Sequence, residues 1–421
     1  MHRETSRDAV VLPMGLETKS YECVRSIAEH GLRPIVASEY DSVPAAGSRF
    51  CTETVSVPSP ETDLLAYRDA LLDLAATPDV ATILPLRSRD TYLFSKYRSE
   101  FEEHISLVTP PMGLLRTVHD RMELVDAAER AGVAVPKTGL LSKWDDRDRE
   151  VIVKSRYNLL VSEYLDRYSE SESETEDLVT HRRPGEELAT EELTKRMGHD
   201  PIVQEYIPSS HEYVFGALYD HGEPLATFQH RQIRGDSYTG GGGVYRKSTD
   251  ITVLERVGRR LLGELNYHGL ACIEYMKHAE TGEYYLTEIN PRLWQSVPCA
   301  IRAGAEFPWY YYLQATDQTD QIDPDYEVGF GTHQIYGEFK HFRSLFTDDS
   351  SIVDRPSIPG TLWDIVVSCY QDPRFDDFRL DDPRPFLRAV KHVLSRQRQT
   401  DHPVRDEDTD RLQPVADPLD H

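Results

Sequence analysis

Apolar and polar positions alternate regularly along the first hundred residues. Three short apolar runs have the length and composition of buried strands. They are "AVVLP" (9–13), "PIVASE" (34–39) and "DVATILPL" (79–86). Helical patterns separate them, one over residues 16–31, which Gly31 ends, and one over residues 63–76. Strands that alternate with helices predict a parallel, Rossmann-like sheet.

The middle of the chain continues as a mixture of strands and helices. One helix is predicted from about Asp120 to Gly132, and another from about Val253 to Leu265. Strands are expected at "REVIVKSR" (149–156), "PIVQEYI" (201–207) and "ACIEYMKH" (271–278). Residues 211–234 predict a hairpin that turns at Asp-His-Gly, residues 220–222. The chain is therefore predicted to have a mixed α/β fold.

Three segments lack such a pattern. Residues 168–192 include "SESESETED" and are acidic and almost free of apolar groups, so we expect a mobile loop. "TGGGGVYR" (239–246) is expected to be flexible. After about residue 320 the chain is aromatic and acidic, with a predicted helix over residues 385–394 and a polar, frayed tail from about Arg398.

Length and charge narrow the class of protein. The 421 residues suffice for two or three domains. A formal net charge of -25 disfavours nucleic acid and anionic membranes as partners, because both would be repelled. The sequence has no long apolar run and no signal-peptide pattern, so we expect a soluble, cytoplasmic protein. Abundant acids and scarce lysine resemble proteins of a salt-rich, halophilic cytoplasm.

The five cysteines are widely scattered and include no C-x-x-C pair. An odd number without close spacing argues against both a disulfide framework and a cysteine zinc site. Buried free thiols are the expected state.

Polar residues share one face of a predicted strand in "YYLTEINPRLWQS" (284–296). Glu288 and Asn290 lie two residues apart, so their side chains point to the same side. Pro291 ends the strand, and Arg292 can direct its planar guanidinium toward a phosphate or a carboxylate. An unrelated surface arginine is the alternative.

The strand before it adds a third oxygen donor. If a three-residue loop ends at a left-handed Gly282, Ala279 pairs with Glu283 and the ladder places Glu274 opposite Glu288. Facing carboxylates repel each other unless a cation lies between them, and Mg²⁺ prefers such oxygen ligands. The alternative is an ordinary half-exposed hairpin whose polar face meets water. A one-residue slip would turn Glu274 to the other face.

This hairpin resembles the metal-binding hairpin of the ATP-grasp superfamily, which has Glu on one strand and Glu-x-Asn-x-Arg on the next. Three earlier segments resemble other parts of the superfamily, in the same order and with similar spacing. Residues 120–139 are similar to its first helix and strand, 151–156 to its phosphate-binding lysine strand, and 203–213 to its adenine-binding hinge. With residues 375–390 included, the chain is most similar to predicted ATP-dependent carboxylate-amine ligases.

The resemblance implies three regions. A Rossmann-like domain would span residues 1–115, and a two-lobed ATP-grasp domain residues 116–320, with lobes of about 116–203 and 204–320. Residues 321–421 would form a small C-terminal extension with a disordered acidic tail.

The resemblance also implies roles at the centre of the site. Glu274, Glu288 and Asn290 would hold one or two Mg²⁺ ions, with Mn²⁺ as an alternative, that bridge the phosphates of ATP. Lys154 would neutralise nucleotide phosphate, unless it is only a surface lysine at a strand end. Arg292 would face the transferred phosphoryl group or the acyl intermediate.

The resemblance of residues 203–213 to the adenine-binding hinge implies the remaining nucleotide contacts. The backbone of Gln204, Glu205, Tyr206 and Ile207 would read adenine, since main-chain groups supply a donor and an acceptor in fixed geometry. Glu212 would accept the ribose hydroxyls; otherwise it is merely an exposed strand residue.

Two features depart from the family pattern, and the roles of two further arginines stay open. Arg121 stands where the family usually has a lysine near the phosphates, which keeps the charge but not the geometry. The usual glycine-rich turn after Lys154 is missing. Arg231 and Arg234 either grip an anionic substrate or only pair with surrounding acids.

The implied activity is that of a ligase. It would activate a carboxylate as an acyl phosphate with ATP, join it to an amine, and release ADP and phosphate. One alternative is an ATP-grasp kinase or a ligase that forms another bond, and a second is a nucleotide-binding sensor with little turnover. The expected partners are a small carboxylate and a small amine, and a homodimer remains open.

Overall fold

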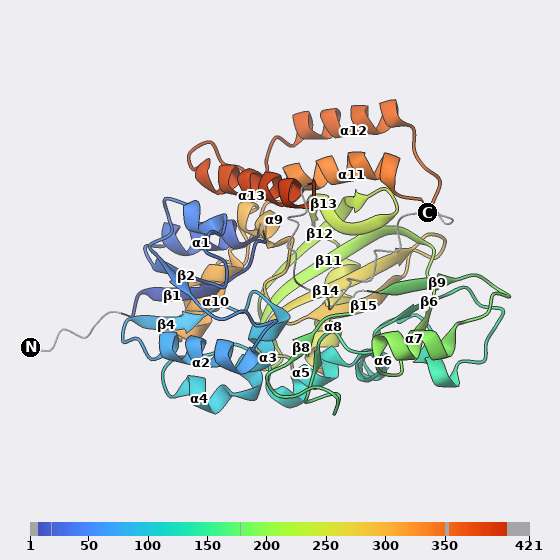
Figure 1. Ribbon diagram of the computed structural model, residues 1–421, viewed down its shortest axis with the longest axis horizontal. Coiled ribbons are helices and arrows are strands. Elements are labelled where there is room, and N and C mark those ends of the chain that lie inside the picture. The colour runs from blue at the N-terminus through green and yellow to red at the C-terminus, as the bar shows by residue number, and fades with distance from the viewer. Residues whose placement is uncertain (1–6, 18, 177, 350–352, 402–421) are drawn as a thin grey trace, which may run out of the picture.

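The protein contains three main sheets and a C-terminal group of helices (Figure 1). The computed structural model describes residues 7–401, except residues 18, 177 and 350–352. Its N-terminal part lies at the left of Figure 1, a large sheet crosses the centre, and three helices lie along the top. Parallel and antiparallel sheets occur together, which confirms the predicted mixed α/β fold.

The N-terminal part is built on a parallel sheet with the strand order β3-β2-β1-β4. Its strands are β1 (Ala9–Pro13), β2 (Arg33–Ser38), β3 (Glu53–Ser56) and β4 (Val80–Ile83). Its helices are α1 (Lys19–Glu29), η1 (Ala45–Gly47), α2 (Leu64–Ala75), α3 (Ser88–Lys96), α4 (Arg98–Glu102) and α5 (Met112–His119). The predicted Rossmann-like alternation is confirmed, although the pattern did not predict β3 or α3 to α5.

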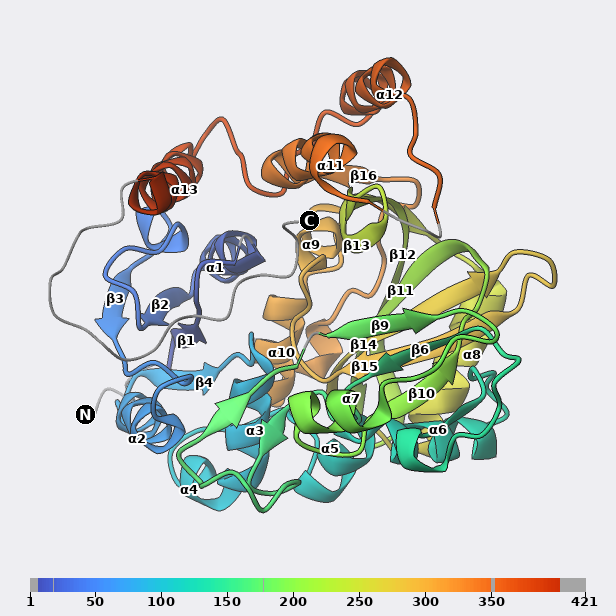
Figure 2. The same cartoon turned by 45° about the vertical axis from the view of Figure 1, so that its right-hand side comes forward.

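A smaller antiparallel sheet follows, with the strand order β5-β10-β6-β9. Its strands are β5 (Thr138–Leu140), β6 (Val151–Lys154), β9 (Val179–Arg182) and β10 (Ile202–Glu205). The accompanying helices are α6 (Arg121–Arg130), η2 (Leu141–Lys143) and α7 (Thr190–Met197). Asp120 caps α6 by accepting a hydrogen bond from the Met122 N–H, as expected at a helix start. The small sheet lies beside the large central sheet (Figure 2).

The prediction of a mobile loop over residues 168–192 is wrong. This range holds β8 (Ser173–Glu174), which pairs with β7 (Leu160–Val161), and β9, which pairs with β6. Arg89 of α3 donates to Ser173 Oγ at 2.8 Å, and the Leu64 N–H donates to the Ser171 carbonyl at 2.8 Å. Hydrogen bonds to distant segments therefore order a stretch whose own composition predicts disorder.

The large antiparallel sheet has the strand order β15-β14-β11-β12-β13-β16. Its strands are β11 (Ser209–Asp220), β12 (Glu223–Ser237), β13 (Gly240–Thr249), β14 (Gly269–His278), β15 (Tyr284–Asn290) and β16 (Gly331–His333). Helices α8 (Thr252–Glu264), α9 (Val297–Arg302), α10 (Phe307–Ala315) and η3 (Thr319–Gln321) connect and cover it. The predicted turn between β11 and β12 is confirmed, but the glycine run expected to be flexible forms the start of β13.

The two faces of the large sheet have separate cores. Phe215 and Ile273 point to one face and pack with Leu261 of α8. On the other face, Trp294 lies against Gly216, where an added Cβ would come within 2.5 Å of the indole ring. Alternate strand residues point to opposite faces, so one sheet serves both cores. Glycine at position 216 lets the indole lie flat on the sheet.

The C-terminal part is not separate from the large sheet. Strand β16 pairs with β13, and helices α11 (Ile335–Thr347), α12 (Ile358–Gln371) and α13 (Arg384–Asp401) follow. Arg379 donates to both carboxylate oxygens of Glu22 on α1, which ties this part to the N-terminal sheet. The predicted helix over residues 385–394 is confirmed within α13, whereas residues 402–421 of the predicted tail lie outside the described residues. In the described ranges, no helix has the length and apolar character needed to span a bilayer.

Candidate active site

The β14–β15 hairpin brings two carboxylates together. Glu274 of β14 pairs with Glu288 of β15, so the prediction that they lie opposite each other is confirmed. Thr287 is an extra residue that forms a β-bulge between this pair and the next pair, Tyr275 and Leu286. The Thr287 hydroxyl donates to the Glu274 carbonyl at 3.0 Å. Bulges of this kind redirect side chains near functional ends of strands.

The loop of this hairpin is one residue longer than predicted. It comprises residues 279–282, because His278 rather than Ala279 pairs with Glu283 through an N–H to carbonyl bond of 2.9 Å. Gly282 has φ +71°, the left-handed conformation that was predicted. The longer loop and the bulge each shift the register by one residue, and the two shifts cancel.

Glu274, Glu288 and Asn290 converge on one side of the hairpin. Asn290 Nδ2 donates to Glu288 Oε1 at 2.8 Å and to Glu274 Oε1 at 3.4 Å. Burial, together with the charge of Glu288, raises the pKa of Glu274. Burial acts in the same direction on Glu288, but Arg121 and Lys154 outweigh it and lower the pKa of that carboxyl. The pair therefore combines an ionised carboxylate with a carboxyl that resists ionisation.

Two cations from the smaller-sheet lobe approach these carboxylates. Arg121, the first residue of α6, donates from Nη2 to Glu288 Oε2 at 2.9 Å and from Nη1 to the Ser155 carbonyl at 2.8 Å. Lys154 ends β6, and burial and the nearby Arg121 lower its pKa to about 8 against the attraction of Glu288 and Glu274. The structure thus places both predicted phosphate-binding cations beside the carboxylate pair.

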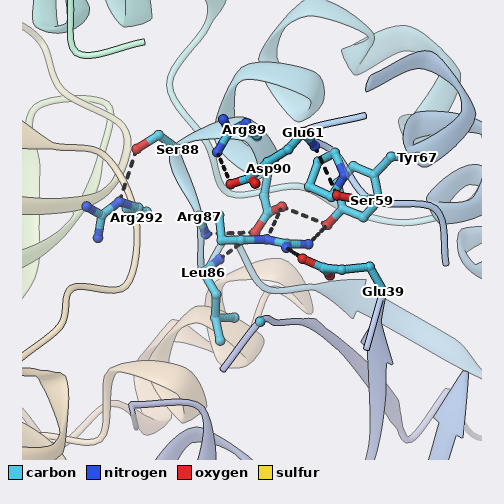
Figure 3. Close-up of polar contacts among 12 residues, drawn as sticks. Glu39, Ser59, Glu61, Tyr67, Leu86, Arg87, Ser88, Arg89, Asp90 and Arg292 are labelled. Carbon is cyan, nitrogen blue, oxygen red and sulfur yellow. Dashed lines mark hydrogen bonds and ion pairs between the residues drawn. The ribbon is translucent and has the colours of Figure 1, made fainter. Parts of the chain in front are cut away.

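Arg292 links the hairpin to the N-terminal part. Its Nη2 donates to Asn290 Oδ1 at 3.2 Å, and its Nε donates to the hydroxyl of Ser88, the first residue of α3, at 3.2 Å (Figure 3). Thr91 of the same helix donates to the Pro291 carbonyl at 2.9 Å. The guanidinium therefore lies where the N-terminal part meets the carboxylate pair.

Buried ion pairs hold the loop before α3 in place (Figure 3). Arg87 donates to the two oxygens of Glu39 at 2.9 and 3.1 Å. Asp90, which is fully buried, accepts hydrogen bonds from the Tyr67 hydroxyl at 2.8 Å and from the Arg87 N–H at 2.7 Å. Because each charge has partners, the loop presents Ser88 to Arg292 in a fixed position.

A cavity of about 470 Å³ opens beside the carboxylates, a size typical of small-molecule sites. Its lining includes Glu212, Gln232, Gly241, Arg246, Glu274 and Trp294. Val179 of β9 lines it from the smaller sheet. Burial raises the pKa of Glu212. The predicted ribose contact therefore lines the same cavity as Glu274.

Some backbone N–H groups of the predicted adenine-binding hinge already donate hydrogen bonds within the protein. The Glu205 N–H donates to the Lys137 carbonyl at 2.9 Å, and the Tyr206 N–H donates to the Glu150 carbonyl at 2.9 Å. Gln204 lies within β10 and its side-chain amide donates to a neighbouring strand. Within the described chain, the N–H of Ile207 makes no backbone hydrogen bond. The N–H groups of Glu205 and Tyr206 therefore already have backbone partners, and the N–H of Ile207 is the donor that stays open for the predicted adenine contact.

Arg231 and Arg234 do not line the cavity. Arg234 Nη1 donates to both carboxylate oxygens of Glu338 at 2.7 Å. Arg231 pairs with Tyr213, whose ring packs in the core on the face away from Glu212. For Arg234 the structure bears out the alternative of pairing with an acid.

Three residues that line the cavity were missed by the sequence reasoning. Arg246 is 1% exposed and forms an ion pair with Asp376. His230 Nε2 lies 2.7 Å from Ser296 Oγ, and burial lowers the pKa of His230 to about 3, so the ring is neutral. Trp294 is the third. Strand parity could have indicated His230, which lies in the predicted hairpin, whereas Arg246 belongs to β13, a strand that was not predicted.

Comparisons with known proteins agree with this geometry at the level of the fold. No protein-family profile matches the chain. Among curated proteins, a stretch of 43 residues is 51% identical to acetyl-CoA carboxylase 2 and 52% identical to acetyl-CoA carboxylase 1 of Arabidopsis thaliana. The stretch covers 10% of this chain and only 2% of the length of either carboxylase.

Solved structures share the architecture over most of the chain. The ADP complex of the purK protein, N5-carboxyaminoimidazole ribonucleotide synthetase, has a TM-score of 0.56 and 16% identity over 79% of this chain and 82% of its own. The biotin carboxylase domain of Hydrogenobacter thermophilus 2-oxoglutarate carboxylase, with MgADP and bicarbonate, gives 0.56 and 16% over 76% and 73%. L-amino acid ligase from Bacillus licheniformis gives 0.55 and 13% over 75% and 77%. The chain has the ATP-grasp fold, as its sequence motifs predicted.

Proposed function

We propose that this protein is an ATP- and Mg²⁺-dependent carboxylate-amine ligase. The observation that carries the proposal is the pairing of Glu274 with Glu288 at a cavity, with Asn290 beside both carboxylates. The fold supports it, because solved structures with this architecture hold ADP or MgADP. An L-amino acid ligase also shares this architecture.

The donor set fits a hard divalent cation. Glu274, Glu288 and Asn290 offer oxygen ligands, which Mg²⁺ and Mn²⁺ prefer. Like charges opposite each other destabilise a sheet, and a cation between them removes that repulsion. Asn290 now directs Nδ2 at the carboxylates, so its amide must turn for Oδ1 to join the set. One or two bound ions would neutralise charge on the phosphates of ATP.

Cations around the pair suit a polyphosphate. Lys154 supplies a compact charge on a flexible stem, and Arg121 supplies a planar one that now holds Glu288. We place the adenine at the N–H of Ile207 and the ribose at Glu212, which lines the cavity. In these assignments the bound nucleotide extends from the hinge, past Glu212, to the carboxylate pair.

The chemistry of a carboxylate substrate follows from this arrangement. A carboxylate oxygen attacks the terminal phosphorus of ATP, and ADP leaves with the bridging oxygen. An amine then attacks the carbonyl carbon of the acyl phosphate, phosphate leaves, and a proton passes to solvent or buffer. Arg292, between Asn290 and Ser88, is placed to hold the anionic substrate or its acyl phosphate at the N-terminal side. Small acids and amines are therefore the proposed partners.

One contact favours a second candidate, a nucleotide sensor with little turnover. Arg121 forms a 2.9 Å ion pair with Glu288 and so occupies an oxygen that a metal ion would use. A ligase must release this pair when MgATP binds, whereas a sensor could keep it. Arg121→Lys separates the two, because lysine keeps the charge but loses the second donor. If the protein is a ligase, Arg121→Lys should keep ATP turnover. If it is a sensor, the variant should bind nucleotide more weakly, and neither it nor the wild type should turn over ATP.

The proposed function is tested by screening amino acids, peptides and small acids for stimulated ADP formation with MgATP. Glu288→Gln serves as the blank, because the neutral amide keeps the shape and lacks the charge. Hydroxylamine added to an active mixture should trap the acyl phosphate as a hydroxamate. ADP formation that needs an acid and an amine, with hydroxamate in place of product, supports the ligase; ATP consumption that no acid stimulates contradicts it.

We also propose that the protein works in a salt-rich cytoplasm. Its 72 acidic residues outnumber 47 lysines and arginines, so the folded chain repels itself unless salt screens the charge. The unfolding midpoint should rise as KCl increases into the molar range. A midpoint that falls with KCl would contradict the assignment.

A further inference from the structure

A second group of metal-binding side chains lies outside the cleft, at the turn between β11 and β12. Asp220 Oδ1 is 2.7 Å from His221 Nδ1 and 3.2 Å from His268 Nδ1. The two imidazole rings are 4.2 Å apart between centroids and tilted by 36°. One ligand atom from each of the three residues lies within 4.8 Å of the others. We propose that Asp220, His221 and His268 form a site for a divalent transition-metal ion such as Zn²⁺.

The backbone builds this cluster from two distant segments. His221 and Gly222 have φ +46° and +89°, the left-handed pair that a two-residue turn between Asp220 and Glu223 needs. The Gly222 N–H donates to the Tyr267 carbonyl at 2.7 Å. That bond fastens the turn to the segment leading into β14 and sets the two histidines side by side before any ion binds.

The protonation states suit a metal ion. Burial and the neighbouring His221 lower the pKa of His268, which favours the neutral imidazole that binds metals. Burial opposes the charge of Asp220, but His221 and His268 outweigh it and lower the pKa of that carboxyl. The nearby Arg98 is already held by Glu102 at 2.8 Å and by the Thr109 carbonyl at 2.6 Å. Two imidazoles and a carboxylate select zinc, nickel or copper over magnesium.

A second cluster of possible metal ligands is unsuitable for binding a metal ion. His333, Glu338 and Cys369 also place ligand atoms within 4.8 Å of one another. However, Arg234 donates to both oxygens of Glu338. Hydrogen bonds with Cys369 and Glu338 outweigh burial and raise the pKa of His333 to about 9, so that ring is protonated at neutral pH. Positive charges already satisfy Glu338, whereas among the described residues no lysine or arginine forms an ion pair with Asp220.

The test measures Zn²⁺ binding to the full chain in excess Mg²⁺, which saturates the oxygen ligands of the cleft. We expect one tightly bound Zn²⁺ and an affinity that falls more than about tenfold in His221→Ala, His268→Ala or Asp220→Asn. His181→Ala is the matched control, because His181 pairs with Glu150 at 2.7 Å but belongs to no group of three metal-binding side chains within the described ranges. Glu288→Gln should also bind Zn²⁺ normally, which separates this site from the cleft.

A spectroscopic readout keeps the test independent of activity. Cu²⁺ bound at one equivalent should show two coordinated imidazoles by electron paramagnetic resonance, and one in His268→Ala. Equal Zn²⁺ affinity in the wild type and His268→Ala would overturn the proposal. So would Cu²⁺ without imidazole ligands, or Zn²⁺ that is lost with Glu288→Gln but kept in the histidine variants.

Discussion

Asp90 and Glu274 are both acids in the interior, yet their surroundings differ. Asp90 is fully buried and accepts hydrogen bonds from Tyr67 and from two backbone N–H groups, with Arg87 as its ion-pair partner. In the part of the chain that the structure describes, the carboxylate of Glu274 has one hydrogen bond, from Asn290 at 3.4 Å, and faces Glu288. A structural acid is saturated with donors, whereas an acid left unsaturated beside a like charge is suited to a ligand.

The largest effect should come from the unsaturated pair. Glu288→Gln removes the ionised member, and we expect turnover to fall about a thousandfold, near 4 kcal/mol of activation free energy. ADP release with the best acid and amine measures it. Glu280→Gln, an exposed change in the loop of the same hairpin, should leave turnover unchanged. Full activity in Glu288→Gln would show that the cleft carboxylates are structural like Asp90.

Asp90, whose carboxylate has several hydrogen-bond donors, should contribute to stability rather than to turnover. Asp90→Ala leaves Arg87 with one carboxylate partner fewer, and we expect a loss of about 3 kcal/mol in the free energy of unfolding. Urea denaturation measures it. Asp69→Ala is the control, since Asp69 is 62% exposed and bonded to its neighbour Arg68, and it should change stability by less than about 0.5 kcal/mol. Similar losses in both variants would remove the distinction.

The free energy of unfolding as a function of pH extends the comparison to His333, a buried side chain with hydrogen-bond partners. Its pKa is raised to about 9 by Cys369 and Glu338 despite burial, above the ordinary value of 6.5. The folded state therefore binds the proton more tightly, so its stabilising effect is complete below pH 6.5 and is lost as the pH rises through 9. We expect a decline of about 3 kcal/mol over that range. Denaturation of His333→Gln should show a flatter profile, and an unchanged slope would refute the assignment.

The smallest effect should be on the stability of Glu274→Gln. Without metal, this change puts a neutral amide in place of a carboxyl whose ionisation is opposed by burial and by Glu288, so we expect stability to stay equal or rise by up to about 1 kcal/mol. Thermal unfolding in EDTA measures it. With MgATP the order should reverse, because only the wild type gains the full binding free energy. A large loss in EDTA would mean that Glu274 is structural.

The sequence predicted elements wherever local signals were strong. Gly31 at the end of α1, the helix starts at Asp63 and Asp120, and the turn at residues 220–222 all appear as expected. Local signals failed for residues 168–192 and for β13, because long-range hydrogen bonds order these segments. Tertiary contacts override weak local preferences in this way.

The sequence predicted the three oxygen donors of the candidate site but not the contacts that hold them in place. Glu274, Glu288 and Asn290 could be placed on one face because strand side chains alternate every second residue. The ladder reached that result only because a bulge at Thr287 compensated a longer loop. Arg234 shows the converse: its partner Glu338 lies 104 residues away, and nothing local to either residue indicates the pair.

The sequence by itself determined the class of many elements, the order of the motifs that resemble the ATP-grasp superfamily and the shared face of the hairpin carboxylates, since these depend on periodicity and neighbouring residues. Only the tertiary structure decided which cations meet those carboxylates, how Arg292 reaches Ser88, and why His221 lies beside His268. Such contacts join residues far apart in the chain, and the free energy that selects them comes from packing and charge pairing across the whole molecule.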